Sequence, residues 1–203
     1  GLVVYALGSV GREGLTPLKM TLAGAAVAAF ASSLTHALLL VDQKTMQDVL
    51  FWLAGSVQGR KLSLLIEALP YMAAAWVGAI AVAGPINTLM LGEDVARGLG
   101  QRTVLVKAFA GAVVVVLCGS SVAVAGPIGF IGLVTPHLAR YLVGNDIRWV
   151  VLYSAFLGAI VLTAADIAAR FLAAPGEVPI GVMTALIGTP FFIYTARKRT
   201  DRS

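Results

Sequence analysis

Residue types that could perform catalysis or bind a metal are few in this 203-residue chain, and they are scattered. No GxxxxGK[ST] nucleotide loop is present, so we expect no ATP hydrolysis by the chain itself. The two histidines, His36 and His137, are too far apart in sequence to suggest a metal cluster, and we expect no bound metal or other cofactor. Ser32, Ser33 and His36 share one stretch, but no oxyanion motif accompanies them. An intramembrane protease is therefore a poor fit.

The chemistry that stands out is a cluster of charges between two apolar runs, in NTLMLGEDVARGLGQRTVLVK at residues 87–107. Such a segment cannot lie in hydrocarbon, because each charge at mid-bilayer costs about 2.5–3.5 kcal/mol. Gly92 and Gly100 bracket a helix-favouring run with acids at its start and an arginine near its end, as a helix dipole prefers. This pattern predicts a short amphipathic helix, Glu93 to Leu99, that docks onto another molecule.

The composition places this loop in a membrane protein. Hydrophobic residues make up 59% of the chain and charged residues only 12%, about half the share usual in soluble domains. The only cysteine, Cys118, lies within an apolar run, so no disulfide is expected. The net charge of +5 is spread over loops, which gives no reason to expect nucleic-acid binding.

The apolar runs predict an all-α polytopic bundle, with residues 1–203 as one transmembrane domain. An apolar stump at residues 1–7 is followed by spans at 18–41, 62–84, 103–124, 149–172 and 180–196, long enough to cross a core of about 30 Å. Residues 42–61 combine polar and aromatic side chains, which is typical of a helix at the membrane surface. Pro70 is expected to kink its span.

Residues 126–143 are less regular, because glycines and Pro127 surround Phe130. We expect a part-extended, part-helical segment rather than one straight helix. Thr135 followed by Pro136 suggests a helix N-cap with proline at the first helical position.

Basic residues set the expected orientation. With a cytoplasmic C-terminus, alternation places eleven of the fifteen basic residues on the cytoplasmic side, and only Lys44, Arg60, Lys61 and Arg170 on the other. This asymmetry fits the positive-inside rule and puts the loop at residues 87–107 in the cytoplasm.

Four motifs in order, LMLGEDVARGLG, GPIGFIGLVTPHLARYLVGNDIR, ADIAAR and EVPIGVMTALIGTPFFIY, closely resemble the FecCD family of ABC-importer permeases, which carry iron-siderophores, haem or cobalamin. The resemblance runs over essentially the whole chain. Family members are typically ten-helix proteins, so it implies about six of roughly ten spans here, with the first spans absent.

The resemblance implies a permease in a bacterial cell (inner) membrane, working with a second permease subunit, two ATPase subunits that bind ATP and magnesium, and an external substrate-binding protein. Ferric siderophore is the first choice of substrate, with haem or cobalamin as the alternative. A carrier or channel that needs no ATPase is the alternative of another class.

The resemblance also assigns roles to residues. Coupling helices at about residues 88–102 would contact the ATPase through Leu91, Gly92, Glu93, Ala96, Arg97, Leu99 and Gly100. Arg170 and Arg60 would contact the binding protein. In the alternative interpretation, Arg170 only forms an ion pair with Asp166 in its own helix. Ser32, Ser33 and His36 would line the translocation path. The remaining family-motif positions are Gly126, Pro127, Gly129, Phe130, Gly132, Pro136, His137 and Arg140.

Overall fold

The structure, a computed structural model, describes residues 17–39, 49, 52–57, 61–172, 178–186 and 188–190. Helices account for 86% of these residues and none of them lies in a strand, which confirms the predicted all-α class. The chain divides into two compact units, Gly1–Leu50 and Phe51–Ser203.

The first unit contributes one long helix, α2 (Pro17–Leu39). At 1.5 Å per residue its 23 residues extend about 35 Å, enough to cross a bilayer core. Its apolar part, Thr21–Ala37, is shorter than the apolar helices of the second unit, Leu62–Met90, Thr103–Ala125 and Ile147–Phe171. Most of its described side chains are exposed within the unit, as expected for a helix whose neighbours are lipid or other helices.

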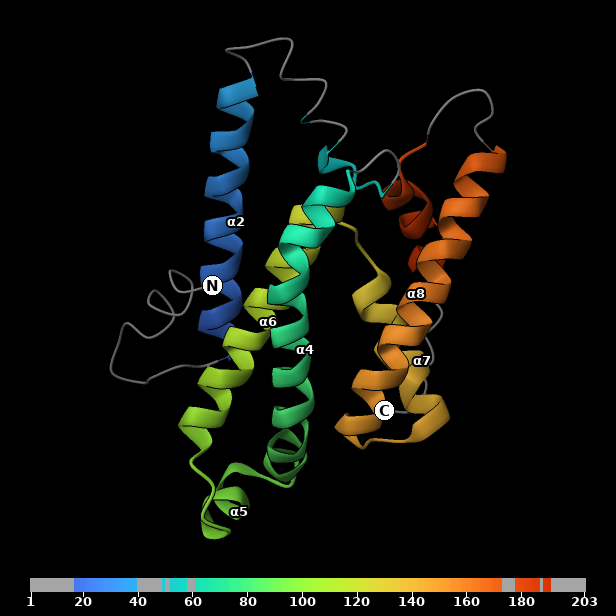
Figure 1. The fold of residues 1–203 in the computed structure, drawn as a ribbon. Coiled ribbons are helices and arrows are strands. Elements are labelled where there is room, and N and C mark those ends of the chain that lie inside the picture. The colour runs from blue at the N-terminus through green and yellow to red at the C-terminus, as the bar shows by residue number, and fades with distance from the viewer. Residues whose placement is uncertain are drawn as a thin grey trace. The chain divides into compact units, whose positions relative to one another are not determined.

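The second unit contains α4 (Leu62–Met90), α5 (Glu93–Gly98), α6 (Thr103–Ala125), α7 (Ile131–Val143) and α8 (Ile147–Leu172), and a short helix follows at Ile180–Pro190 (Figure 1). Among the described residues, α4, α6 and α8 are long and apolar enough to cross a membrane. The chain is therefore a multi-pass membrane protein. The stump at 1–7, the surface segment at 42–48 and the end of the last predicted span lie outside the described residues.

Helix α4 is longer than the predicted span at 62–84, because it continues through Pro85 to Met90. A proline inside a helix removes one backbone hydrogen bond. Here the side chain of Gln101 donates a hydrogen bond to Pro85 O (2.9 Å) and so adds a tie at this turn. The predicted end of the span at residue 84 is therefore wrong. Pro70 also lies inside α4, and the helix continues past it.

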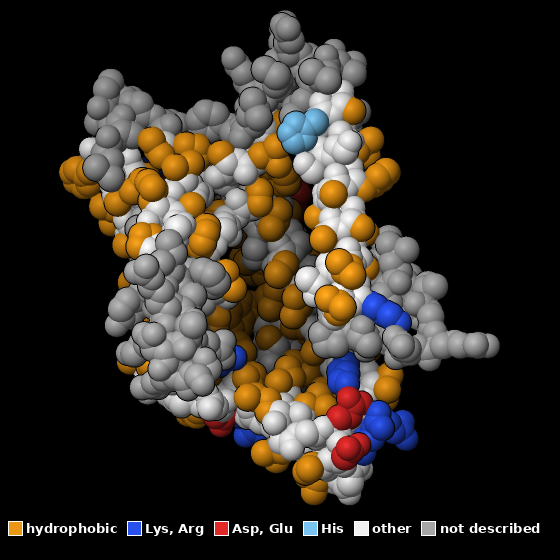
Figure 2. Space-filling model, turned by 180° about the vertical axis from the view of Figure 1, so that it is seen from behind, with side chains coloured by type: hydrophobic (Ala, Val, Ile, Leu, Met, Phe, Trp, Pro, Cys, Tyr) orange, Lys and Arg blue, Asp and Glu red, His pale blue; other side chains and the backbone are white. Residues whose placement is uncertain are grey.

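Small side chains let these helices approach closely. A Cβ at Gly78 of α4 would come within 2.8 Å of Val113 Cγ2 on α6, so only glycine fits at this crossing without a shift. Around this crossing, α4 also buries Ala75, Ala79, Val82 and Ala83. Large apolar side chains cover most of the outer helix surfaces, whereas charged side chains gather around α5 (Figure 2). This distribution suits helices surrounded by lipid or by further spans.

The part-extended, part-helical segment predicted at residues 126–143 is confirmed. Residues 126–129 are not helical, Phe130 adopts a positive φ of 66°, and α7 begins at Ile131. The predicted N-cap at Thr135 is wrong: Phe130 O already accepts hydrogen bonds from Leu133 N and Val134 N, which close the first turn. Thr135 is buried inside α7 and donates its hydroxyl to Ile131 O (2.8 Å), and Pro136 follows within the helix.

A glycine junction, formed by Gly55, Gly126 and Gly181, holds three distant segments together. Ser56 N donates to Ala125 O (2.9 Å), and Gly181 N donates to Gly55 O (3.3 Å). A Cβ at any of the three glycines would come closer than 3.0 Å to a backbone oxygen of another segment. The three backbones therefore cross in direct contact, which no larger residue would permit.

Candidate functional site

The charged loop between α4 and α6 has a defined backbone. Leu91 N and Gly92 N donate to Thr88 O and Leu89 O, which ends α4. Gly92 then turns the chain with φ 120° and ψ 147°, a conformation close to one essentially restricted to glycine. The next six residues form α5. The predicted helix is confirmed, with its end one residue earlier than expected.

Gly100 ends α5 in a Schellman motif. Its N–H donates to Arg97 O (2.9 Å), and Gln101 N donates to Ala96 O (3.0 Å), while Gly100 itself has φ 80°. Gly92 and Gly100 are therefore both placed where the backbone leaves the conformations that other residues favour. The two glycines bracket α5 as the sequence predicts.

Glu93 is the centre of the loop's polar contacts. Its Oε1 accepts hydrogen bonds from Arg97 Nη2 (2.7 Å) and Thr103 Oγ1 (3.2 Å), and its Oε2 accepts one from Lys107 Nζ (2.5 Å). The hydrogen bond from Lys107 lowers the pKa of Glu93 most, and the nearby positive charges of Lys107 and Arg97 lower this pKa further. Glu93 thus ties the start of α5 to the first turns of α6.

The loop combines this polar base with an apolar outer rim. Ala96 and Thr103 are buried at its base, at 0% and 3% exposure. The large apolar side chains of the loop instead point outward: Met90, Leu91, Val95 and Leu99 are all exposed. An apolar rim on a charge-stabilised base is suited to docking into a groove of another protein.

The predicted coupling residues therefore fall into two groups. Leu91, Gly92, Arg97, Leu99 and Gly100 are exposed, and Glu93 is partly exposed, so they are accessible to a partner. Ala96 is fully buried, so its side chain supports the loop from inside and does not face a partner. Val95, which the sequence interpretation did not single out, precedes Ala96 and is exposed.

A second polar cluster at the same end was not predicted. Asn87 Nδ2 on α4 donates to Asp146 Oδ1 (2.6 Å), and Asn87 Oδ1 accepts from Ile147 N (2.8 Å) at the start of α8. Asp146 Oδ1 also accepts from Arg148 N (2.9 Å), so Asp146 caps α8. The hydrogen bond from Asn87, and then the one from Arg148 N, lower the pKa of Asp146. We call Asn87 and Asp146 the α4–α8 clamp.

Two ends of the second unit can now be distinguished. At the α5 end, α4 ends and α6 and α8 begin. The α4–α8 clamp also lies at this end. At the far end, the glycine junction meets the last turns of α8, where Ala165 and Ala169 pack against Ile180 and Met183. Arg170 lies there, with its Nε donating to Asp166 Oδ2 (2.9 Å) and its side chain 58% exposed. Arg60, the other predicted docking residue, lies outside the described residues.

The family-motif residues follow the chain from the far end toward the α5 end. Gly126 belongs to the glycine junction, and Phe130 packs over Gly188 of the last described helix. Pro127 and Gly129 form the non-helical connection, and Gly132 and Pro136 lie in α7. His137 makes an edge-to-face contact with Tyr141 (5.2 Å between centroids), and Arg140 is exposed in the last turn. These residues lead into α7 and form part of it.

The residues predicted for the translocation path all lie on α2. His36 Nδ1 lies 2.7 Å from Ser32 O, to which it donates, and 3.4 Å from Ser32 Oγ. Ser32, Ser33 and His36 are exposed within the first unit. Their role in a translocation path stays a prediction.

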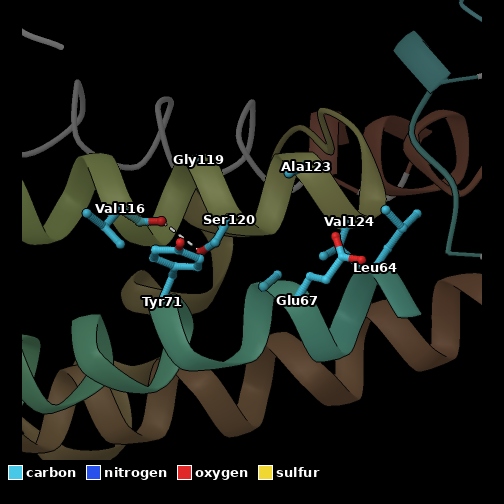
Figure 3. Close-up of a pocket in the computed structure, with 9 residues that line it drawn as sticks. Leu64, Glu67, Tyr71, Val116, Gly119, Ser120, Ala123 and Val124 are labelled. Atoms are coloured by element: carbon cyan, nitrogen blue, oxygen red, sulfur yellow. Dashed lines mark hydrogen bonds between the residues drawn. The ribbon is translucent and has the colours of Figure 1, made fainter. Parts of the chain in front are cut away.

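An open groove of about 390 Å³ lies between α4 and α6. Tyr71 of α4 lies beside Ser120 of α6, and Glu67 lies farther along α4 near Val124 (Figure 3). The hydroxyl of Ser120 donates to Val116 O (2.7 Å) and is thus occupied within its own helix. The groove is mostly apolar, and in the described part of the chain no group of three His, Cys, Asp or Glu side chains could hold a metal ion.

Comparison with known proteins matches residues 1–198 to the FecCD transport family. The chain is 59% identical over 196 residues to the Bacillus subtilis (strain 168) protein named "Probable siderophore transport system permease protein YfiZ". It is 42% identical over 198 residues to the Fe(3+)-citrate import system permease protein YfmD of the same organism. These matches cover 97% and 98% of this chain, which spans 59% of the length of each relative.

A solved structure of similar fold is described as a metal-chelate type ABC transporter in an inward-facing conformation. It superposes on this chain with a TM-score of 0.79 at 28% sequence identity. The match covers 90% of this chain and 61% of the chain in the solved structure. The helical arrangement is thus that of an ABC metal-chelate permease. Since the family profile matches nearly the whole chain, this protein belongs to the FecCD transport family.

Proposed function

We propose that this chain is part of the permease subunit of an ABC importer that carries a metal chelate into the cytoplasm. A separate ATPase subunit drives the transport. The observation that carries this proposal is the loop around α5, in a chain matched to a transport-permease family. Its exposed apolar rim stands on a base fixed by Glu93, Arg97 and Lys107.

The loop's proposed role is to dock into a groove on the ATPase at the cytoplasmic face. Docking can transmit force only through a segment that keeps its shape. Glu93 joins α5 to α6, and Gln101 joins the end of the loop to α4, so the loop moves with both helices. Leu91, Val95 and Leu99 then supply the apolar contact area.

Arg170 is proposed to dock the external substrate-binding protein at the far end. The ion pair with Asp166 holds its guanidinium in place while more than half of the side chain stays exposed. A guanidinium can form two hydrogen bonds with a partner carboxylate, which suits recognition of an acidic surface. The pairing with Asp166 and the docking role are compatible.

Ferric siderophore is the proposed substrate, supported by the names of the two Bacillus relatives above. Haem or cobalamin remains the alternative chelate, and an ATPase-independent carrier the alternative of another class. The complete subunit is proposed to pair with a second permease and two ATPases, to which ATP and magnesium bind.

The experiment uses the complete subunit, reconstituted in vesicles with its ATPase and the binding protein loaded with ferric siderophore, haem or cobalamin. We expect ATP-dependent uptake of the siderophore. Uptake without ATPase would establish the carrier, and uptake of haem or cobalamin alone would correct the substrate.

Docking is tested by cross-linking in the same complex, after replacing the exposed native thiol with Cys118→Ser. Val95→Cys or Leu99→Cys should cross-link to a cysteine on the ATPase. Ile160→Cys, exposed on the middle of α8, is the matched control and should not. Absence of cross-links from both loop positions in every nucleotide state would contradict docking.

A further inference from the structure

One turn of α4, residues 84–88, has contacts with both the loop and α8. Gln101, at the end of the loop, donates to Pro85 O. On the α8 side, the Arg148 guanidinium lies against Gly84, where an added Cβ would come within 2.7 Å of Nη2. Asn87, one turn of helix beyond Gly84, makes both contacts of the α4–α8 clamp. This turn of α4 therefore contacts both the loop and the start of α8.

The clamp is specific in its chemistry. The Asn87 amide uses its donor on the Asp146 carboxylate and its acceptor on Ile147 N, one of the backbone N–H groups that the helix cannot satisfy internally. The two contacts go to the capping residue and to the first residue of α8. The Asn87–Asp146 bond is exposed, so it contributes less to folding than the buried contacts of Val82, Ala83 and Val150 nearby.

The other end of α8 carries Arg170. With 26 residues, α8 extends about 39 Å as a continuous helix from the clamp to the far end. A continuous helix moves largely as one body, so a shift of its first turn is carried to its last. The clamp therefore connects the loop that meets the ATPase in our proposal to the surface that meets the binding protein.

We propose that the α4–α8 clamp is the positioning element that couples the α5 loop to α8, so that binding-protein docking at the far end stimulates the ATPase. This inference rests on the proposed function. Asn87 and Asp146 touch neither ATP nor substrate. They act by making α8 follow the end of α4.

The chemistry of the clamp provides a sharp test. Asn87→Asp faces Asp146 with a second carboxylate, and the two repel each other. Asp146→Asn keeps an oxygen that can accept from both Asn87 Nδ2 and Arg148 N, and asparagine is also a good N-cap. The double variant exchanges the two residues, so the amide at position 146 can donate to the carboxylate at position 87, and Ile147 N and Arg148 N can still donate to side-chain oxygens. Thr163→Ala is the control, because it removes a hydroxyl bonded only within α8.

The readouts are ATP hydrolysis by the full reconstituted complex with and without loaded binding protein, retention of the ATPase, and the thermal melt. For Asn87→Asp we expect stimulation by the binding protein to fall by at least about fivefold. Basal hydrolysis, ATPase retention and the melt should stay at the level of the unchanged protein. Asp146→Asn, the exchanged pair and Thr163→Ala should all be stimulated normally.

Full stimulation of Asn87→Asp would overturn the inference. So would an exchanged pair that melts normally yet stays unstimulated. Asn87→Asp could instead lose the ATPase or melt at a much lower temperature, with the exchanged pair restoring both. That result would show that the clamp serves stability and does not couple the two sites. If the unchanged protein itself retains no ATPase, the proposed function fails, and the inference fails with it.

Discussion

Replacing Gly92 by valine tests whether backbone conformation at the loop entrance holds α5 in place. The nearest atom to a Cβ there is Val95 Cγ2 at 3.9 Å, so the new side chain has room. The cost comes from the backbone, because φ 120° and ψ 147° lie where residues with side chains are strained by about 1–3 kcal/mol. The strain lowers the free energy needed to unfold α5 locally by the same amount, if local unfolding relieves it.

Hydrogen exchange measures this loss directly. The amides of Ala96, Leu99, Gly100 and Gln101 are all bonded within α5 or its C-terminal turn. A decrease of about 1–3 kcal/mol in their opening free energy corresponds to roughly 5- to 150-fold faster exchange. The assay is mass spectrometry of the peptide covering residues 93–101 in the complete subunit.

Gly98→Ala is the matched control, since Gly98 lies in α5 with nothing within 4 Å of an added Cβ and no positive φ. It should slow exchange, because alanine favours a helix over glycine by about 0.5–1 kcal/mol. Unchanged exchange in Gly92→Val would refute the reasoning. Equal acceleration by both variants would show that any substitution in the loop disturbs it.

Three further predictions concern other parts of the second unit. Glu93 has a lowered pKa, so its contribution to loop order is complete above its ordinary value of 4.5 and is lost as the pH falls through the lower folded value. A spin label at Leu99 should gain mobility over that acidic range, whereas in Glu93→Gln it should be mobile throughout; a label insensitive to both changes would contradict this. Arg170→Gln should weaken binding-protein affinity, most at low salt, and leave the melt nearly unchanged, because an exposed pair contributes only about 0.2–1 kcal/mol; intact affinity with a collapsed melt would make Arg170 structural. Gly181→Ala should lower the melt by forcing a Cβ against Ala54 O, at a cost of about 1–3 kcal/mol, whereas Gly111→Ala, with nothing within 4 Å, should not; equal melts would count against the close crossing.

The parts of the structure that sequence predicted well depend on local signals. Gly92, Gly100 and the charges between them lie within one short stretch, and each acts on its own neighbours, so α5 was placed to within one residue. The predicted pair of Asp166 and Arg170 is also local, one helical turn apart. Apolar runs located α4, α6 and α8, because a membrane span requires continuous hydrophobicity.

The errors arise where the local structure depends on contacts with residues that are distant in the sequence. A proline such as Pro85 is typical of a helix end. Here the hydrogen bond from Gln101 to Pro85 O and the one from Asn87 to Asp146 stabilise one more turn of α4. The start of α7 was misplaced because nothing in a phenylalanine indicates the positive φ of Phe130. The clamp joins residues 59 positions apart, and neither carries a signal for the other. One of the two residues, Asp146, could have been identified from the sequence, since an aspartate directly before a long apolar helix is a typical N-cap.

The glycine junction has a consequence for how the protein is made. Gly55 and Gly126 emerge from the ribosome well before Gly181, whose N–H completes the crossing through Gly55 O. During synthesis the earlier helices must therefore enter the membrane with this crossing still open. The far end can close only after the segment around Gly181 has been made, so until then Gly55 O lacks the hydrogen bond from Gly181 N.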